Sequence, residues 1–167
     1  IDQLGMPLVG NPNLKPETAT TWDLGAEWRM SSKLTTGVSL YETTLQDMIY
    51  GKTLSTQLNG YDQILKENAG EAKVKGVELT ASSLITDWLR LDLAYAYTDA
   101  KITKNDAEPL TVGNQIAQTP ENMWTIALAA SHQKWSGLLE AKYADRVYST
   151  ESNTEKVQGV YGGYDAY

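Results

Sequence analysis

Apolar and polar residues alternate along much of the chain. Between Trp22 and Met30 every second residue is apolar, and polar or small residues fill the positions between them. A period of two places successive side chains on opposite faces of a β-strand. The same pattern returns at residues 34–40, 77–82, 89–98, 124–131 and 139–144. The alternation therefore predicts six strands, and residues 164–167 are typical of the start of a seventh.

The connections between these predicted strands alternate in length. A short polar turn follows the first, third and fifth strands, which predicts three β-hairpins. The other connections are long and polar, at residues 46–67, 99–121 and 149–163. Short turns at one end of a sheet and long loops at the other are typical of an outer-membrane barrel. The predicted fold is all-β, an antiparallel up-and-down meander of about six to seven strands that forms a partial segment of a large transmembrane β-barrel.

Alternation alone leaves two arrangements open. In a soluble β-sandwich the apolar face covers a core and the polar face meets water. In a barrel the apolar face meets lipid and the charged face lines a wet or plugged interior. Both arrangements accommodate the charged residues of the polar face, which are Asp23, Glu27, Arg29, Glu78, Arg90, Asp92, Glu140, Lys142 and Arg146.

The aromatic residues favour the barrel. The chain has 5 Trp and 10 Tyr but no Phe, so its large rings carry the polar group that suits a boundary between oil and water. Tryptophans stand beside the short turns, and further rings, including Tyr97, Tyr143 and Tyr148, stand near the opposite strand ends. The spacing matches a membrane strand of ~9–11 residues. We therefore expect two aromatic girdles, one with Trp28, Trp88 and Trp135 beside the short turns and one with Trp22 and Trp124 at the opposite strand ends. A core that uses Tyr in place of Phe is the alternative.

Charge and composition narrow the function. With 14 basic and 21 acidic residues and a net charge of −7, the chain lacks the basic clusters that nucleic acid requires. There is no Cys and a single His, so thiolate metal sites, Cys nucleophiles and His-centred triads are absent from this sequence. No stretch approaches the ~20 apolar residues of a membrane-spanning helix. These observations predict neither nucleic-acid binding nor a cofactor.

Carboxylates are the only plentiful catalytic groups. A glycosidase-like pair such as Glu78 and Asp92 would be needed for an enzyme, but both follow the strand periodicity, which favours a role in the wall of the sheet. We predict no enzymatic activity and no catalytic residue. His132 is expected in an exposed turn. The acidic loop residues could bind Ca²⁺, although plain solvation is the favoured interpretation and no metal site is predicted; they are Asp99, Asp106, Glu108, Glu151 and Glu155.

Four sequence blocks resemble a known family. The block NPNLKPET from Asn11, followed by WDLGAEW from Trp22, resembles the "N-P-x-L-K-P-E, then strand" signature in the barrel of TonB-dependent outer-membrane receptors. The other blocks are NAGEAKVKGVELTAS (68–82), WLRLDLAYAYTDAKI (88–102) and QTPENMWTIALA (118–129). Together with the terminal GGYDAY they cover nearly the whole chain in the order of the family.

The resemblance implies that residues 1–167 are part of a receptor β-barrel in the outer membrane of a Gram-negative bacterium. The Pro, Gly and Asn residues of positions 1–21 predict an extended entry segment with no helix. The resemblance places the plug domain, the TonB-contacting box and the final strands outside this sequence. The expected partners are outer-membrane lipid, the TonB energy-transducing system acting through the plug, and a scarce nutrient. A ferric siderophore is the preferred nutrient, with haem, cobalamin or a glycan also open.

Two further expectations accompany this interpretation. About six strands cannot close a barrel of about 22 strands, so the isolated segment is expected to self-associate through its open edge strands. The alternative function is a soluble β-sandwich or carbohydrate-binding module of a secreted or surface protein, in which surface Trp and Tyr would stack on sugars.

Candidate site residues fall into two groups. The aromatic and amide residues of the long loops are the candidate ligand contacts, although each could equally pack locally: Tyr50, Asn59, Tyr61, Tyr148 and Tyr161. The other group consists of fold-motif residues: Asn11, Pro12, Leu14, Lys15, Pro16, Glu17, Asn68, Gly70, Gly76, Glu78 and Pro120. We expect the prolines to impose an extended, kinked path, Lys15 to pair with Glu17, and Gly76 to form a β-bulge.

Overall fold

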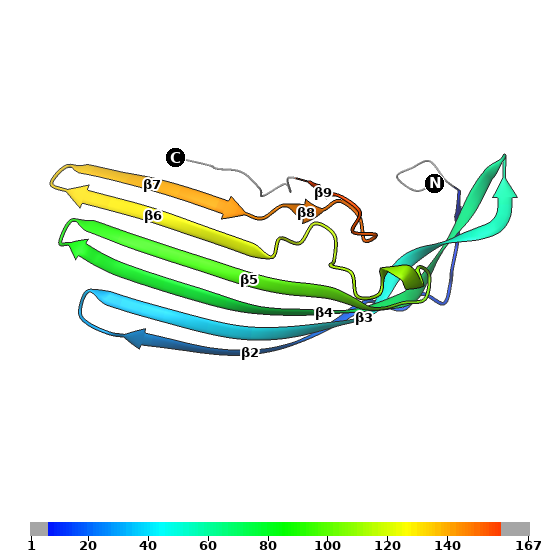
Figure 1. Cartoon of the computed structure of the whole chain (residues 1–167), viewed down its shortest axis with the longest axis horizontal. Coiled ribbons are helices and arrows are strands. Elements are labelled where there is room, and N and C mark those ends of the chain that lie inside the picture. Colours follow the sequence, from blue (N-terminus) through cyan, green and yellow to red (C-terminus); the bar gives the residue numbers. More distant parts are fainter. Residues whose placement is uncertain (1–6, 158–167) are drawn as a thin grey trace.

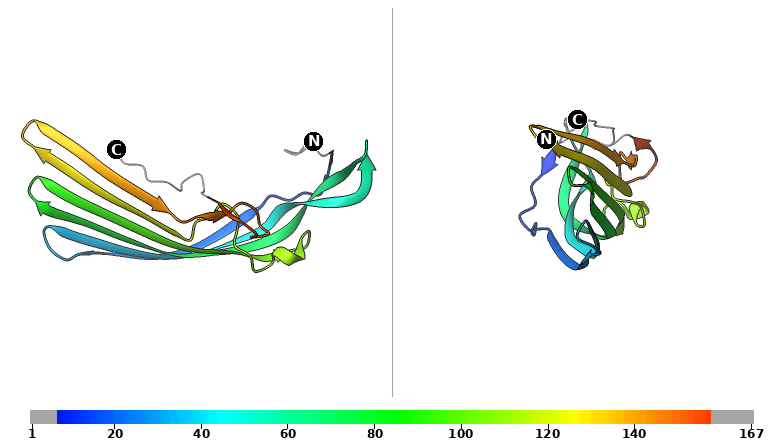
Figure 2. Two further views of the ribbon diagram at one scale, coloured as in Figure 1. Left: turned by 45° about the horizontal axis from the view of Figure 1, so that its top comes forward. Right: turned by 90° about the vertical axis from the view of Figure 1, so that its left-hand side faces the viewer.

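The computed structural model describes residues 7–157, most of which form one curved sheet, while two short strands between residues 147 and 157 form a separate small sheet (Figures 1 and 2). Neighbouring long strands are antiparallel and lie in sequence order. They are β2 (Thr18–Arg29), β3 (Leu34–Leu58), β4 (Tyr61–Thr86), β5 (Leu89–Asn105), β6 (Asn122–His132) and β7 (Trp135–Ala144). This order confirms the predicted all-β meander. The expected strand at residues 164–167 lies outside the described residues.

Short elements lie at the end of the sheet opposite the tight turns. Strand β1 (Leu8–Val9) pairs in parallel with β4, and β8 (Val147–Tyr148) pairs with β9 (Lys156–Val157). A single turn of 3₁₀-helix, η1 (Pro109–Thr111), follows β5. Within residues 7–157 no helix has the length and hydrophobicity needed to cross a membrane.

The strand register places the apolar positions of all six long strands on one face. Leu24 pairs with Leu40, and Leu93 pairs with Ile126. The same face continues across β3, β4 and β7 through the pairs Val38–Leu79, Leu79–Tyr95 and Ile126–Ala141. Much of this face is open, since Trp22 is 78% and Leu24 is 73% exposed. Among the described residues no second sheet covers it, so the sandwich arrangement is not supported (Figure 2).

The strands are longer than the alternation predicts. Residues 46–67, expected as a polar loop, are mostly the outer part of the β3–β4 hairpin. Its tip is the pair Asn59–Gly60, with φ of 55° and 83°, the positive values that a tight hairpin turn requires. The alternation failed here because the pairing register shifts between Leu45 and Met48 and again between Met48 and Ile49. Each shift interrupts the period of two.

The predicted β-bulge at Gly76 is wrong. Residues 74–77 pair without interruption with both β3 and β5, and the shifts in the β4–β5 pairing lie between Glu71 and Ala72 and between Leu84 and Thr86. Gly76 instead lies opposite Tyr41, and a Cβ at this position would overlap the tyrosine ring. Glycine is required here by the close approach of that ring and not by a change in register.

Candidate ligand-binding surface

The long-connection end of the sheet is built from three segments. The β3–β4 hairpin projects furthest, the β5–β6 connection contains η1, and the segment after β7 contains β8 and β9 (Figures 1 and 2). The buried apolar residues gather at this end, where connections fold onto the sheet: Ile64, Ala69, Ala72, Ala100, Ile102, Ala144 and Val147. The candidate ligand-contacting segments therefore lie at the end of the sheet where apolar side chains are buried.

One buried amide organises the β5–β6 connection. Asn105 is only 2% exposed, and its Nδ2 donates to Thr111 Oγ1 at 2.9 Å. Its Oδ1 accepts hydrogen bonds from the backbone N–H groups of Ala107 and Glu108 at 3.1 and 3.0 Å. The side chain thus closes the turn into η1, as Asn commonly does in turns.

After η1 the chain returns along the edge of β5. The N–H of Gly113 donates to Ile102 O, the N–H of Ile116 donates to Ala100 O, and the N–H of Thr98 donates to Glu121 O, at 2.8–2.9 Å. These bonds use the backbone groups of β5 beyond Tyr97, the last residue of β5 that pairs with β6. The connection is therefore held to the sheet along its length.

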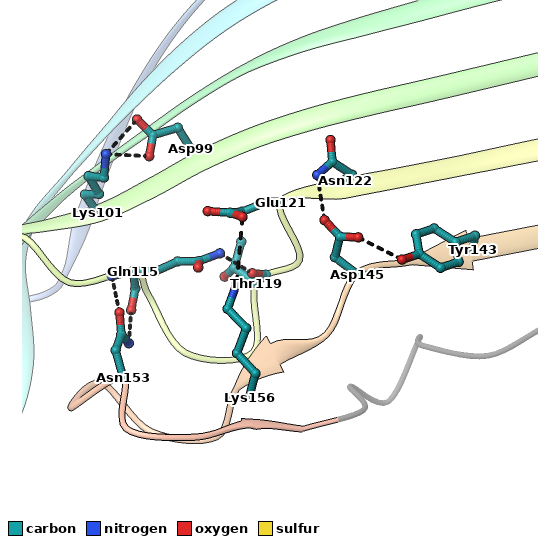
Figure 3. A network of polar contacts seen from close by, with 10 residues as sticks. All are labelled: Asp99, Lys101, Gln115, Thr119, Glu121, Asn122, Tyr143, Asp145, Asn153 and Lys156. Carbon is teal, nitrogen blue, oxygen red and sulfur yellow. Dashed lines mark hydrogen bonds and ion pairs between the residues drawn. The ribbon is translucent and has the colours of Figure 1, made fainter.

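A network of polar contacts joins the β5–β6 connection to the β8–β9 segment (Figure 3). Asn153 Oδ1 accepts from the Gln115 N–H at 2.7 Å, and Asn153 Nδ2 donates to Gln115 O at 2.9 Å. Lys156 lies 3.9 Å from Glu121 Oε2 and 4.8 Å from the centre of the Tyr148 ring. The two connections thus form one hydrogen-bonded body.

The base of this body is tied to β6 and β7. Asp145 accepts hydrogen bonds from Asn122 Nδ2 at 2.5 Å and from the Tyr143 hydroxyl at 2.9 Å (Figure 3). Tyr95 on β5 donates to Asn122 Oδ1 at 2.7 Å. Because three neighbouring strands contribute to these bonds, the loops emerge from the sheet in a defined direction.

Tyr50 is the most perturbed titratable group of this end. Its ring lies against Gly70, and its hydroxyl is buried without a hydrogen-bond partner. Burial, followed by the nearby carboxylates of Glu151, Glu17 and Glu108, raises the pKa of Tyr50 to about 12. Burial and then Glu108 also raise the pKa of Glu151. This end of the sheet therefore carries a concentration of negative charge around a buried hydroxyl.

An open cavity of about 360 Å³ lies beside η1. It is lined by Glu108, Pro109, Leu110, Thr111, Asn114 and Ser152, and the Leu110 side chain is almost fully exposed. A carboxylate, hydroxyls and an amide around an exposed leucine can contact a ligand of mixed polarity. The sequence predicts Glu108 only as a solvated acid and does not reveal the cavity, because residues from two separate connections form it.

The candidate ligand contacts are not gathered at one point. Asn59 and Tyr61 lie together at the hairpin tip, where Tyr61 is 62% exposed. Tyr50 is half-buried further along the same hairpin, and Tyr148 lies on β8 beneath Lys156. Tyr161 lies outside the described residues. The role of these residues as ligand contacts stays a prediction.

The tryptophans lie in two rows along the sheet. Trp28, Trp88 and Trp135 stand at or beside the tight turns, and Trp22 and Trp124 stand towards the opposite end. Trp124 stacks on Tyr143 with ring centres 5.5 Å apart, and Trp88 meets His132 edge-on at 6.2 Å. Across the described residues no group of three or more His, Cys, Asp or Glu side chains could hold a metal ion.

The fold-motif residues of the first two blocks meet in the structure. Asn11 Nδ2 donates to Lys66 O at 2.8 Å, and the N–H of Lys15 donates to Asn68 Oδ1 at 2.8 Å. The expected pairing of Lys15 with Glu17 is wrong, since Glu17 Oε1 accepts from the Ile49 N–H at 2.7 Å and forms no ion pair among the described residues. The carboxylate serves a backbone group instead. The other motif residues lie around this point or on the strands: Pro12, Leu14 and Pro16 before β2, Gly70, Gly76 and Glu78 on β4, and Pro120 before β6.

Comparisons with known proteins agree with this architecture. The family described as "TonB dependent receptor-like, beta-barrel" matches residues 2–167. A vitamin B12 transporter, BtuB of Photobacterium profundum, is 27% identical over 156 residues, which cover 93% of this chain and 24% of that protein. The ferrioxamine B receptor of Salmonella typhimurium is 37% identical over 92 residues, covering 51% of this chain and 12% of the receptor.

Solved structures show the same fold. The siderophore receptor PiuA from Acinetobacter baumannii superposes with a TM-score of 0.62 at 24% identity, over 83% of this chain and 20% of the receptor chain. The chain thus spans about a quarter or less of the length of these relatives. At this identity the structural likeness concerns the fold alone.

Proposed function

Since the chain belongs to the TonB-dependent receptor β-barrel family, we propose that it forms wall strands and outer loops of a receptor that takes up a ferric siderophore across the outer membrane of a Gram-negative bacterium. The plug and the remaining strands would come from outside this sequence. Energy would reach the plug through TonB, and the wall would contact lipid.

One observation carries this proposal. The apolar face runs without interruption across six strands, is uncovered among the described residues, and lies between two rows of tryptophan. In water such a face would be an aggregation surface, whereas in a bilayer it meets hydrocarbon and the rings meet the interfaces. All long connections lie at one end of this band, as receptor loops that face the exterior do.

The ligand class is supported by the relatives and by the loops. One relative is a receptor for ferrioxamine B. We propose that the hairpin tip, with Asn59 and Tyr61, and the cavity beside η1 contact the ligand. Tyr50 and Tyr148, and Tyr161 outside the described residues, complete the proposed contacts. Phenol and amide groups suit a chelate that presents carbonyl oxygens and an apolar backbone.

The test uses the intact receptor that contains this chain, displayed in the outer membrane of cells lacking their own siderophore receptors. Binding of radiolabelled ferric siderophores is measured at several concentrations, with cobalamin as a second ligand. We expect saturable siderophore binding that Tyr61→Ala weakens several-fold, because an exposed ring at a binding surface supplies much of the contact area. The matched control is Thr56→Ala, an exposed residue on the same hairpin.

Two results would contradict the proposal. Saturable binding of cobalamin with no binding of any ferric siderophore would overturn the ligand class. Siderophore binding that is unchanged by Tyr61→Ala and by removal of residues 54–65 would show that this hairpin does not contact the ligand.

A further inference from the structure

The segment before β2 crosses the β3–β4 hairpin like a strap. Strand β1 lies beside Ile64 and Leu65, on the edge of β4 that faces away from β3. Thr18, at the start of β2, pairs with Gln46 on the opposite edge of β3. Residues 10–17, called the strap below, therefore pass across one face of both strands, as the dark blue trace in Figure 1 shows.

The strap crosses at a break in the sheet. On the free edge of β4, pairing with β5 ends near Gly70, where the Asp106 N–H donates to Ala69 O, and pairing with β1 begins at Leu65. Of the three register shifts between β3 and β4, two lie at this crossing, between Leu45 and Met48 and between Met48 and Ile49, and the third lies nearer the hairpin tip, between Thr53 and Gln57. At such shifts some backbone N–H and C=O groups lose their hydrogen bonds to the neighbouring strand, and these groups need other hydrogen-bond partners.

Asn68 supplies partners for the strap and for the shifted strand together. Its Oδ1 accepts from the Lys15 N–H at 2.8 Å, and its Nδ2 donates to Lys15 O at 2.9 Å. The same Nδ2 also donates to Asp47 O at 2.7 Å, and Asp47 has a positive φ of 56°. One amide side chain thus joins the strap to both strands of the hairpin.

Glu17 bonds the strap to β3. Its Oε1 accepts from the Ile49 N–H at 2.7 Å, directly after the second register shift. A carboxylate that accepts from a backbone N–H makes a stronger bond than a neutral acceptor does. Further along, Asn11 Nδ2 donates to Lys66 O at 2.8 Å, so the strap is bonded to the hairpin at both of its ends.

We propose that Glu17 and Asn68 form a clasp that fixes the angle at which the β3–β4 hairpin leaves the sheet. Register shifts bend strands, and the β3–β4 hairpin turns away from the rest of the sheet at this end (Figure 2). Without the clasp, water would bind the backbone groups that the register shifts leave without partners. Water can do so in more than one backbone geometry, so the hairpin would sample several directions. Both residues are positioning residues for the hairpin tip that carries Asn59 and Tyr61, and this consequence for ligand binding rests on the proposed function.

The direction of the hairpin is measured by spin labelling of the intact receptor. Nitroxide labels are attached through Thr56→Cys near the tip and Gln133→Cys in a tight turn, both exposed positions. Pulsed electron paramagnetic resonance then gives the distribution of distances between the labels. We expect one narrow distribution with the clasp intact, and a broadened or divided distribution in Glu17→Ala and in Asn68→Ala.

Conservative variants separate positioning from folding. Glu17→Gln keeps an acceptor for the Ile49 N–H and is expected to retain the narrow distribution. The matched control is Asn13→Ala, an exposed strap residue whose side chain makes no hydrogen bond among the described residues. Narrow distributions in both Glu17→Ala and Asn68→Ala would overturn the clasp, and so would equal broadening in Asn13→Ala. If Asn68→Ala does not fold, the comparison of Glu17→Ala with Glu17→Gln decides alone.

Ligand binding distinguishes this inference from the proposed function. If the tip contacts the ligand, Glu17→Ala weakens binding, and its effect becomes smaller in a Tyr61→Ala background because both changes act through the same contact. A broadened distance distribution with unchanged ligand affinity would support the clasp and contradict the ligand role of the hairpin. No ligand is needed for the distance measurement, so the two proposals fail independently.

Discussion

Two glycines of β4 are explained by tyrosine rings of β3 that cover them. Gly76 lies under Tyr41 and Gly70 under Tyr50, and both glycines are buried. The Tyr41 hydroxyl shares a hydrogen bond of 2.9 Å with Thr98 Oγ1, so the ring spans β4 to reach β5. An aromatic ring that covers a cross-strand glycine contributes to register and to burial.

We predict that Gly76→Ala destabilises the receptor by ~1–3 kcal/mol, because the new methyl group must displace a ring that is held at its hydroxyl. The free energy of unfolding is measured by urea titration of the receptor in vesicles. Gly137→Ala is the matched control, since a Cβ there has no atom within 4 Å. Equal effects of the two changes would show that the ring does not confine Gly76.

The raised pKa of Tyr50 predicts that the folded protein loses stability at alkaline pH. Its pKa is raised from 10.0 to about 12 in the folded protein, chiefly by burial, and it lies on the hairpin beyond the apolar band. The folded state therefore retains a proton that the unfolded chain releases, so this contribution is complete below pH 10 and is lost as the pH rises towards 12.

We expect Tyr50→Phe to remove this part of the alkaline decline. At neutral pH the change should be neutral or slightly stabilising, because the buried hydroxyl has no partner to lose. Unfolding is followed between pH 8 and about 12, with Tyr61→Phe as the control for an exposed phenol of the same hairpin. The same alkaline slope in wild type and Tyr50→Phe would refute the assignment.

At the scale of the elements, the two faces of each strand have different surroundings. On β2, Trp22, Leu24 and Trp28 lie on the open apolar face, whereas Asp23 and Glu27 point to the other side of the sheet. Along the polar face, Arg90 bonds Asp92 at 2.8 Å and Ser82 bonds the same carboxylate at 2.6 Å. The face with internal polar bonds is the one that suits a wet interior.

The effect of Leu24→Arg on the free energy of unfolding distinguishes a strand that faces lipid from a strand that faces water. In a bilayer an arginine on the lipid face costs up to ~2–4 kcal/mol near the midplane. In a soluble protein an already exposed leucine tolerates the change within about 0.5 kcal/mol. We expect the larger loss in the free energy of unfolding in vesicles, and a small effect from Asp23→Arg on the opposite face. A small effect from both would contradict contact between this strand and lipid.

At the scale of the whole molecule, the sheet ends in two open edges. The outer edges of β2 and β7 have no partner strand among residues 7–157, and the sheet curves without closing (Figures 1 and 2). Open edges present unpaired backbone groups that recruit other strands. Neighbouring strands of a larger barrel would satisfy these groups in the proposed receptor.

The isolated chain is therefore predicted to self-associate. Size-exclusion chromatography with light scattering, first in buffer and then in detergent, measures its mass, and circular dichroism measures its β content. We expect β-rich oligomers or a species that requires detergent. A monomer that is stable in buffer would mean that the apolar face is already buried, and the lipid-facing arrangement would be wrong.

The strand cores were predictable because their side chains alternate. From Trp22 to Arg29 and from Leu89 to Tyr97 the side chains alternate between the apolar and the polar face of the sheet without a break. The period of two therefore appears directly in the sequence. The outer half of the β3–β4 hairpin was missed, because three register shifts and burial by different neighbours erase that period. Asn105 and Asn153 were missed as well, since a single polar residue in a loop carries no sign of its burial.

The sequence by itself determined the all-β class, the alternation of short and long connections and the division into an apolar and a polar face, because these depend on neighbours within a few residues along the chain. Only the tertiary structure decided that Glu17 and Asn68 each bond a backbone group of β3 beside a shift in register, that tyrosine rings cover Gly70 and Gly76, and that Gln115 binds Asn153. These contacts join residues up to 53 positions apart, and their partners are selected by the register of the sheet, which no local pattern records.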